Sequence, residues 1–277
     1  IAGAGGGFDI FAGLPLYFAL RGLGKTAFLA NLTFTYMGGT DAEYVGPALW
    51  RVDHRSSGEK KYFPEKYLGE WLHANELPSE VYCFDKVGLT PLRAAYDELV
   101  GRLRVDTVIL VDGGTDIIMR GDETSLGSPA EDITSLAAVA RLDIPGKLVS
   151  CLGFGIDARH GVCHGQFLEN VAALDQQGGY LGAHSLHLGA ADVEAYRSAV
   201  EYVHGCMPER RSFVSDNVLS ALEGQFGDFH RSSRTDTSQL FISPLMSMYW
   251  HFDLGAVARR CLYIDRLEGT HSIFDVQ

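Results

Sequence analysis

Short apolar runs alternate with longer amphipathic stretches along most of this chain. Runs with the length and composition of strands occupy residues 27–36, 80–84, 107–111, 147–152 and 240–243. Stretches with helical periodicity occupy residues 8–22, 90–103, 130–142, 165–177, 193–203, 213–222 and 254–266. This alternation predicts an α/β fold with a Rossmann-like, doubly wound, mostly parallel sheet and helices on both faces.

Several of the expected helices carry specific boundary signals. Pro91 suits the first position of a helix, where its missing N–H costs nothing. The segment from Ser128 to Glu131 has the pattern of a capping box, and Ser212 precedes the helix at 213–222. Pro15 lies inside the first helical stretch and is expected to kink it.

The length of the chain suits one α/β domain over residues 1–277. Within it, residues 37–79 are aromatic and irregular, and we expect an insertion or a flap there. Residues 224–239 are polar and include Arg231 and Arg234, which suit a lid that reaches a carboxylate or a phosphate. A solvated surface loop is the alternative for this segment.

Glycine and aspartate recur where apolar runs end. The four loops are Gly3-Ala4-Gly5-Gly6-Gly7-Phe8-Asp9, Gly38-Gly39-Thr40-Asp41, Asp112-Gly113-Gly114-Thr115-Asp116 and Gly153-Phe154-Gly155-Ile156-Asp157. If the strands are parallel neighbours, all four loops open at the carboxyl edge of one sheet, where ligands bind in open α/β sheets. The sequence therefore predicts a site there, with ligand contacts from Gly3, Gly5, Gly6, Gly7, Asp9, Asp41 and Asp157.

The first loop, Gly3 to Gly7, has the permissive backbone that a phosphate cradle needs at a helix N-terminus. It departs from the dinucleotide fingerprint G-x-G-x-x-G, because Phe8 stands where the last glycine belongs. The Gly24-Lys25-Thr26 segment is not a Walker A motif, since Ala19 replaces its first glycine. A tight strand–helix turn is the alternative to ligand binding.

The densest acidic group follows the run at 107–111. Asp112, Asp116, Asp122 and Glu123 are candidate catalytic residues, and Arg120 between them is a candidate ligand contact. Asp112 and Asp116 could hold Mg²⁺, which prefers oxygen ligands. The same carboxylates could bind sugar hydroxyls or act as a general base toward water. Capping of turns and helices is the alternative for each aspartate taken alone.

His164 is a further candidate acid or base, at the start of the helix after Asp157. Its neighbour Cys163 would lie at the same helix N-terminus, which lowers the pKa of a thiol. Adjacent residues need not face each other, so we expect a buried structural Cys163 and not a Cys–His dyad.

Charge and cysteine content narrow the classes of partner. The net charge of −12 argues against a nucleic-acid or anionic-membrane surface, which needs a basic patch. A small anionic ligand is still allowed, because backbone N–H groups can hold a phosphate.

The five cysteines form no C-x-x-C motif and suit reduced thiols in a cytoplasmic protein. The longest apolar stretch, 10–20, is too short to span a bilayer.

Motifs along nearly the whole chain resemble one uncharacterised family. They are Gly3-Ala4-Gly5-Gly6-Gly7-Phe8-Asp9 with Ala12-Gly13-Leu14-Pro15, Asp112 to Asp116 with Met119 to Glu123, Cys151 to Gly155, and Ser243-Pro244-Leu245-Met246 with Tyr249-Trp250. The family is known as domain of unknown function 1152. The resemblance implies no particular activity.

A shorter resemblance concerns the N-terminal segment alone. Gly3-Ala4-Gly5 followed by Ala12-Gly13-Leu14-Pro15 resembles the opening of sirtuins, in which this loop binds NAD. The resemblance implies an NAD-like or ADP-ribose-like ligand over residues 3–15. The chain lacks the sirtuin Asn-Ile-Asp triplet and zinc cysteine pairs, so it does not imply deacetylation.

These patterns together favour an enzyme that binds a nucleotide-like or phosphosugar ligand at the carboxyl edge of the sheet. The expected reaction is hydrolysis or group transfer at a glycosidic or phosphoester bond, with Mg²⁺ or an NAD-like nucleotide as the candidate cofactor. A non-catalytic nucleotide sensor is one alternative. An NAD-linked oxidoreductase is another, with Asp41 as the candidate ribose contact.

Overall fold

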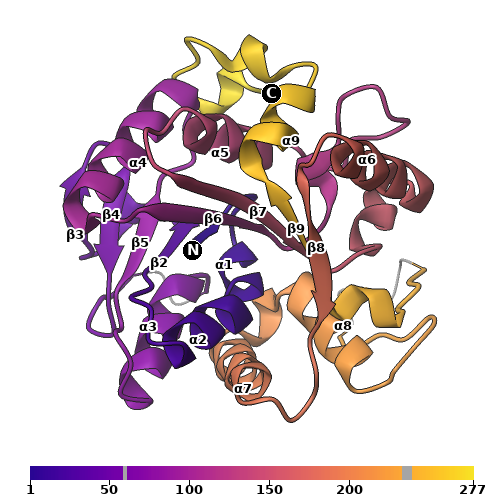
Figure 1. Cartoon of the computed structure of the whole chain (residues 1–277). Coiled ribbons are helices and arrows are strands. Elements are labelled where there is room, and N and C mark those ends of the chain that lie inside the picture. Colours follow the sequence, from indigo (N-terminus) through magenta and orange to yellow (C-terminus); the bar gives the residue numbers. More distant parts are fainter. Residues whose placement is uncertain (59–60, 233–238) are drawn as a thin grey trace.

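A nine-stranded sheet forms the centre of the computed structural model, which describes residues 1–58, 61–232 and 239–277 (Figure 1). Its strand order is β3-β4-β5-β2-β1-β6-β7-β9-β8. The strands are β1 (Ala2–Gly3), β2 (Leu29–Leu32), β3 (Glu43–Gly46), β4 (Leu49–Val52), β5 (Val81–Phe84), β6 (Thr107–Asp112), β7 (Gly146–Leu152), β8 (Tyr180–Ser185) and β9 (Met248–Asp253).

The five central strands, β5-β2-β1-β6-β7, are mutually parallel. At one side β4 and β3 continue the sheet in antiparallel fashion, and at the other side β9 and β8 do so. The predicted α/β class is therefore confirmed, with a sheet that is mostly but not purely parallel. The chain moves outward from β1 through β2 to β5 and then returns to the other side of β1 with β6, so the strand order reverses between β1 and β6.

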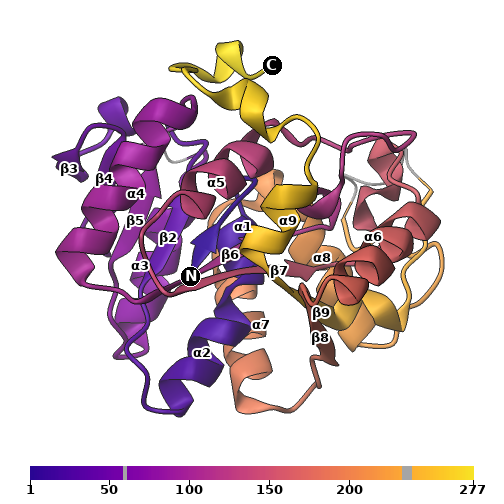
Figure 2. The same ribbon diagram turned by 45° about the horizontal axis from the view of Figure 1, so that its top comes forward.

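Helices cover both faces of this sheet (Figures 1 and 2). One face carries α4 (Leu89–Leu103), α5 (Ala130–Ala140), α6 (His164–Gln176) and α9 (Leu254–Arg260). The other face carries α1 (Asp9–Ala12), α2 (Leu14–Gly22), α3 (Pro64–Ala74), α7 (Ala191–Cys206) and α8 (Phe213–Leu222). Each face has its own large apolar core, because side chains alternate between the two faces along every strand.

The stretch expected as one helix at 8–22 is divided in two at Gly13. Pro15 lies in the first turn of α2, where it neither removes a helical hydrogen bond nor clashes with a preceding turn. The first segment, α1, is a single turn directly after the glycine loop.

The capping box expected at Ser128–Glu131 is wrong. Helix α5 begins at Ala130 with no side-chain cap, because the Ser128 N–H donates to Asp116 Oδ2 and Glu131 pairs with Lys86. In contrast, Ser212 caps α8 as predicted, with its hydroxyl accepting from the Ser215 N–H. The last helix, α9, ends at Arg260 and a separate 3-10 turn follows at Ile264–Leu267, so the expected helix at 254–266 is too long.

Two expected segments differ in form from the prediction. Residues 37–79 contain β3, β4 and α3, which extend the sheet and cover one face of it. No strand forms at 240–243, where Ile242 makes only an isolated bridge with Gly227. The expected lid at 224–239 includes residues 233–238, which lie outside the described residues. Among the described helices, none is both long enough and apolar enough to cross a lipid bilayer.

Candidate functional site

Five aspartates line one cavity of about 210 Å³ beyond the carboxyl ends of β1, β6 and β7. The five are Asp9, Asp112, Asp116, Asp132 and Asp157. We call them the aspartate cluster. Four of them were predicted as site residues from the sequence. The cavity lies where the strand order reverses, which is the usual ligand site of open α/β sheets.

Helix α5 brings the fifth aspartate to this cavity. The Ser135 hydroxyl donates a hydrogen bond of 2.8 Å to the carbonyl of Ala4, which fixes α5 against the first loop. Asp132 lies three residues earlier in the helix, so it shares the face of Ser135 and points to the same loop. The hydrogen bond between Ser135 and Ala4 thus places the Asp132 carboxylate directly over Gly5.

The glycines of one loop make room for the aspartates of another. A Cβ atom on Gly5 would lie 2.6 Å from Asp132 Oδ2 and 2.7 Å from Asp9 Oδ2. A Cβ on Gly113 would lie 2.8 Å from Asp9 Oδ1. Such distances are far below van der Waals contact, so side chains at these positions would displace the carboxylates. This packing explains the glycines at positions 5 and 113, whereas Gly38 and Gly39 pack against Tyr36.

Backbone N–H groups hold most of these carboxylates in place. The Gly5 N–H donates to Asp9 Oδ2 at 2.7 Å, and the Thr115 N–H donates to Asp157 Oδ2 at 2.6 Å. Asp112 accepts from the Ile117 N–H, and Asp116 accepts from the Ser128 N–H. These four loop N–H groups are therefore already engaged by aspartates.

Burial raises the pKa values of all five carboxyl groups, and repulsion by neighbouring carboxylates raises those of Asp9, Asp112, Asp132 and Asp157 further. Desolvation is the largest cause in each case. The pKa of Asp9 is raised to about 8 and that of Asp157 to about 7, while the pKa values of Asp112 and Asp132 are raised well above the ordinary range. Neighbouring carboxylates add to the effect, because like charges in a buried site cannot all ionise at low cost.

Three members of the aspartate cluster have the spacing of metal ligands. One carboxylate oxygen from each of Asp9, Asp112 and Asp132 lies within 4.8 Å of the others. Asp132 is 4% exposed, and its Oδ1 atom has no hydrogen-bond partner among the described residues. A buried, unpartnered carboxylate oxygen beside two others fits a hard divalent cation such as Mg²⁺, which takes oxygen ligands. The residues present therefore suit a metal ion.

The rim of the cavity carries the nearest basic side chains. Arg159 and His160 are exposed residues of the 3-10 turn Ile156–His160 that follows β7. The Arg159 guanidinium stacks on the ring of Phe213 at 4.2 Å from its centroid. The pKa of His160 is lowered, first by desolvation and then by Arg159, so the imidazole is neutral at pH 7.

Other residues expected at the site lie elsewhere. Asp41 is exposed and accepts hydrogen bonds from Ser57. Arg120 pairs with Asp122, and Glu123 accepts from the Arg120 and Gly121 N–H groups and from Asn170. None of these four acidic or basic side chains lines the cavity.

The remaining expected residues flank the site. The His164 ring stacks on Phe154, and its Nε2 atom points to Gly155 outside the aspartate cavity. Its neighbour Cys163 is exposed, which corrects the expectation of a buried thiol. Gly3 belongs to β1 and packs against Asn31, while Gly6 and Gly7 pack against Phe34.

Sequence reasoning missed Asp132 and His160. Asp132 lies in the first turn of its helix, where an aspartate is commonly explained by its favourable interaction with the helix dipole. For this reason it was not predicted as a site residue. The sequence feature that could have identified Asp132 is its position in the stretch from Asp132 to Ala140, whose other residues are small or apolar. A helix that is buried on most sides has little reason to carry a charged side chain.

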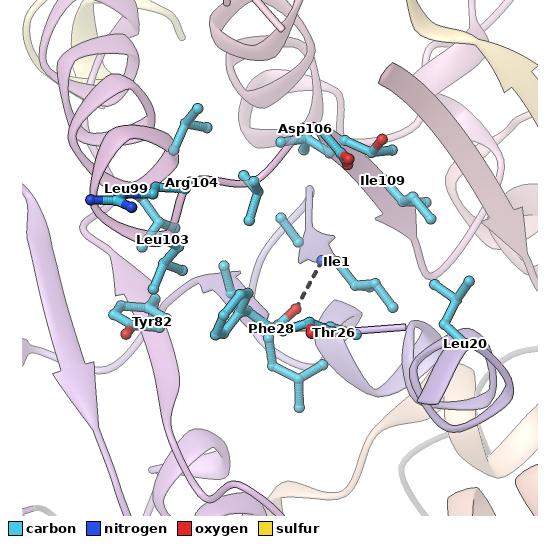
Figure 3. A pocket seen from close by; sticks show the side chains of 18 of the residues that line it. Ile1, Leu20, Thr26, Phe28, Tyr82, Leu99, Leu103, Arg104, Asp106 and Ile109 are labelled. Atoms are coloured by element: carbon cyan, nitrogen blue, oxygen red, sulfur yellow. Dashed lines mark hydrogen bonds between the residues drawn. The ribbon is translucent and has the colours of Figure 1, made fainter. Parts of the chain in front are cut away.

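A larger cavity, of about 690 Å³, lies at the amino ends of β1, β2 and β6 (Figure 3). Mostly apolar side chains line it between the amino ends of β2 and β6, including Phe28, Leu99, Leu103 and Ile109. The backbone of Ile1 donates to the Phe28 carbonyl at its floor. This cavity shares no lining residue with the aspartate cluster, so its size does not bear on the chemistry of that cluster.

Comparison with known proteins identifies a family but no activity. A family model described as "Protein of unknown function (DUF1152)" matches residues 39–277. No curated protein and no solved structure matches the chain. The match covers most of the chain and confirms the resemblance seen in its motifs. The chain belongs to the DUF1152 family of proteins of unknown function.

Proposed function

We propose that this protein is a divalent-cation-dependent enzyme that hydrolyses or transfers a group at a phosphoester or glycosidic bond of a nucleotide-like or phosphosugar ligand. The observation that carries the proposal is the convergence of Asp9, Asp112 and Asp132, with one buried carboxylate oxygen unpartnered, at the carboxyl edge of the sheet.

The charge of the cluster supports a cation as the first ligand. A phosphate placed directly among five carboxyl groups would be repelled by every ionised one. Four loop N–H groups that could offset part of this repulsion already donate to aspartates. Bound there, a Mg²⁺ ion would neutralise the carboxylates, polarise a phosphoryl or sugar oxygen and lower the pKa of a bound water molecule.

The remaining residues have separate roles in this proposal. Asp9, Asp112 and Asp132 hold the cation, and Arg159 at the rim attracts the anionic part of the ligand. Asp157 is a candidate general base, since its pKa of about 7 is near the working pH and suits proton transfer. The neutral imidazole of His160, whose pKa is lowered by desolvation, is a second candidate. Asp116 is held by Ser128 and completes the wall of the cavity.

The arrangement of the central strands agrees with a Rossmann-like assignment, which we include in the proposal. The parallel strands lie in the order β5-β2-β1-β6-β7, with the first strand in the middle, as in doubly wound nucleotide-binding sheets. The antiparallel pairs at the two sides are additions to that core.

The test is a turnover assay over a panel of NAD, ADP-ribose, nucleoside phosphates and sugar phosphates, each with Mg²⁺ and with EDTA. We expect product from at least one compound with Mg²⁺ and none with EDTA. Turnover that persists in EDTA would contradict the cation role. Tight binding of an intact nucleotide without product would favour a non-catalytic sensor. Isothermal titration with Mg²⁺ alone gives an independent readout, and loss of that signal in Asp132→Asn is expected.

A further inference from the structure

A second cavity, of about 180 Å³, adjoins the aspartate cavity. The two cavities share Ile156 and Arg159 in their walls, so they meet at the turn that follows β7. We call the second one the adjoining cavity. Together the two reach the size of small-molecule sites, which is roughly 300–1,000 Å³.

The lining of the adjoining cavity differs from that of the aspartate cavity. Leu240, Met246 and Ile156 are buried apolar residues in its wall, and Phe241 is 70% exposed beside them. No carboxylate lines it within the part of the chain that the structure describes. An apolar cavity with an accessible aromatic ring suits a flat heterocycle, because a base has a π-face that stacks on aromatic side chains.

One polar side chain in this cavity has a defined orientation. Asn217 is 3% exposed, and its Nδ2 atom donates to the Phe213 carbonyl at 2.8 Å. That bond identifies which end of the amide is the nitrogen. The Oδ1 atom accepts no hydrogen bond from any described residue, and it is the end left for a ligand. A carbonyl oxygen accepts from an N–H donor, such as the exocyclic amino group of adenine.

We propose that the adjoining cavity binds the base of a nucleotide, and that Asn217 selects a base with an exocyclic amino group. The phosphate or ribose of the same molecule would then reach the aspartate cavity past Arg159. This inference rests on the proposed function and specifies its substrate class: an adenine-type nucleotide and not a simple sugar phosphate.

The test compares three probes by isothermal titration calorimetry in Mg²⁺: ADP, its inosine counterpart IDP, and ribose 5-phosphate. Stacking of one base on an aromatic side chain predicts that ADP binds about tenfold more tightly than ribose 5-phosphate. IDP lacks the amino group and is expected to bind several-fold more weakly than ADP. Equal affinity for ADP and ribose 5-phosphate would overturn the inference, and equal affinity for ADP and IDP would overturn the role of Asn217.

Two aromatic variants locate the base. Phe241→Ala should weaken ADP about tenfold and leave ribose 5-phosphate unchanged, and its exposure means that the fold should tolerate the change. Phe34→Ala is the matched control, because Phe34 is 49% exposed and lies on the other side of the glycine loop. A loss of ADP affinity in Phe34→Ala, with none in Phe241→Ala, would place the base elsewhere and contradict the inference.

The outcomes separate this inference from the proposal on which it rests. Ribose 5-phosphate could bind in a Mg²⁺-dependent manner with the same affinity as ADP. That result would support cation-dependent binding at the aspartate cavity and would contradict only the proposed base site. If none of the three probes binds with Mg²⁺, the proposed function fails and the base site fails with it.

Discussion

Asp9 and Asp132 face each other across Gly5, although one belongs to α1 and the other to α5. A Cβ atom at Gly5 would lie 2.7 Å from Asp9 Oδ2 and 2.6 Å from Asp132 Oδ2. The missing side chain of Gly5 is therefore what allows these two carboxylates to approach the same point. This approach should therefore govern both cation binding and stability.

Replacing Asp132 by asparagine should abolish Mg²⁺ binding without unfolding the protein. The amide keeps the volume of the side chain but loses the charge that a hard cation needs. Isothermal titration with Mg²⁺ measures the effect. Asp97→Asn is the control, because Asp97 is an exposed residue of α4 away from the cavity. Equal Mg²⁺ affinity in both variants would remove Asp132 from the ligand set.

Cation-free protein should lose stability as the pH rises from about 4 to about 8. The pKa values of Asp9 and Asp157 are raised in the folded state to about 8 and about 7, so the folded state holds more protons than the unfolded chain in this range. The stabilisation is complete below the unfolded pKa near 4 and is lost through the folded pKa values. Melting temperatures across this range test the sign, and Mg²⁺ should restore stability at pH 8. A melting temperature that rises with pH would contradict the raised pKa values.

Binding of Mg²⁺ at pH 7 should release protons. Carboxyl groups with raised pKa values are partly protonated before the cation arrives and must ionise to ligate it. Calorimetric enthalpies measured in buffers with different heats of ionisation report the number released. An enthalpy that is independent of the buffer would mean that the cation binds carboxylates that are already ionised.

Gly5→Ala should weaken Mg²⁺ binding and lower the free energy of unfolding by about 1–3 kcal/mol, because the new methyl group overlaps two carboxylates. Gly22→Ala is the matched control. Gly22 is in helix α2 with no atom within 4 Å of an added Cβ, and alanine is the better helix former. Chemical denaturation and titration of both variants separate the local effect from a general one.

Asn31→Ala should lower the free energy of unfolding by about 1–3 kcal/mol. Asn31 Nδ2 donates to the Gly7 carbonyl and to Glu65 Oε1, both at 2.8 Å, so its loss leaves a buried carboxyl group without this donor. Glu65→Gln keeps an acceptor for Asn31 and removes the buried acid, whose pKa is raised by desolvation. We expect Glu65→Gln to be far less destabilising than Asn31→Ala in urea denaturation, and the reverse order would contradict this account.

The central parallel strands could be predicted from the sequence, whereas the antiparallel strands at the two sides of the sheet could not. Strand β6 has a continuous apolar run, β7 is mostly apolar, and helix α5 between them shows helical periodicity. The edge strand β8 contains Gly182 and mostly exposed side chains, so it lacks that signal. In β9, the side chains of Tyr249 and Phe252 pack into the apolar cores on opposite faces of the sheet. The pairing of this strand with β7 is a long-range contact that no local sequence pattern encodes.

The candidate site could likewise be predicted only in part. Four aspartates that follow apolar runs were found because strand ends are visible in the sequence. Asp132 was missed because its place in the cavity depends on how α5 packs against the first loop, through Ser135 and Ala4. Asp122 and Glu123 are close to Asp116 along the chain, but the loop turns them outward to Arg120 and Asn170.

The packing of glycines against aspartates from other loops has a consequence for how this family can evolve. Gly5 accommodates Asp132, and Gly113 accommodates Asp9, so each pair joins positions that are distant along the chain. A relative that replaces both Asp9 and Asp132 by smaller residues gains room for alanine at position 5, whereas a relative that keeps either aspartate does not. Substitutions at the two members of each pair should therefore covary across the family, and lineages that lost the aspartates should be the ones in which the glycines drift.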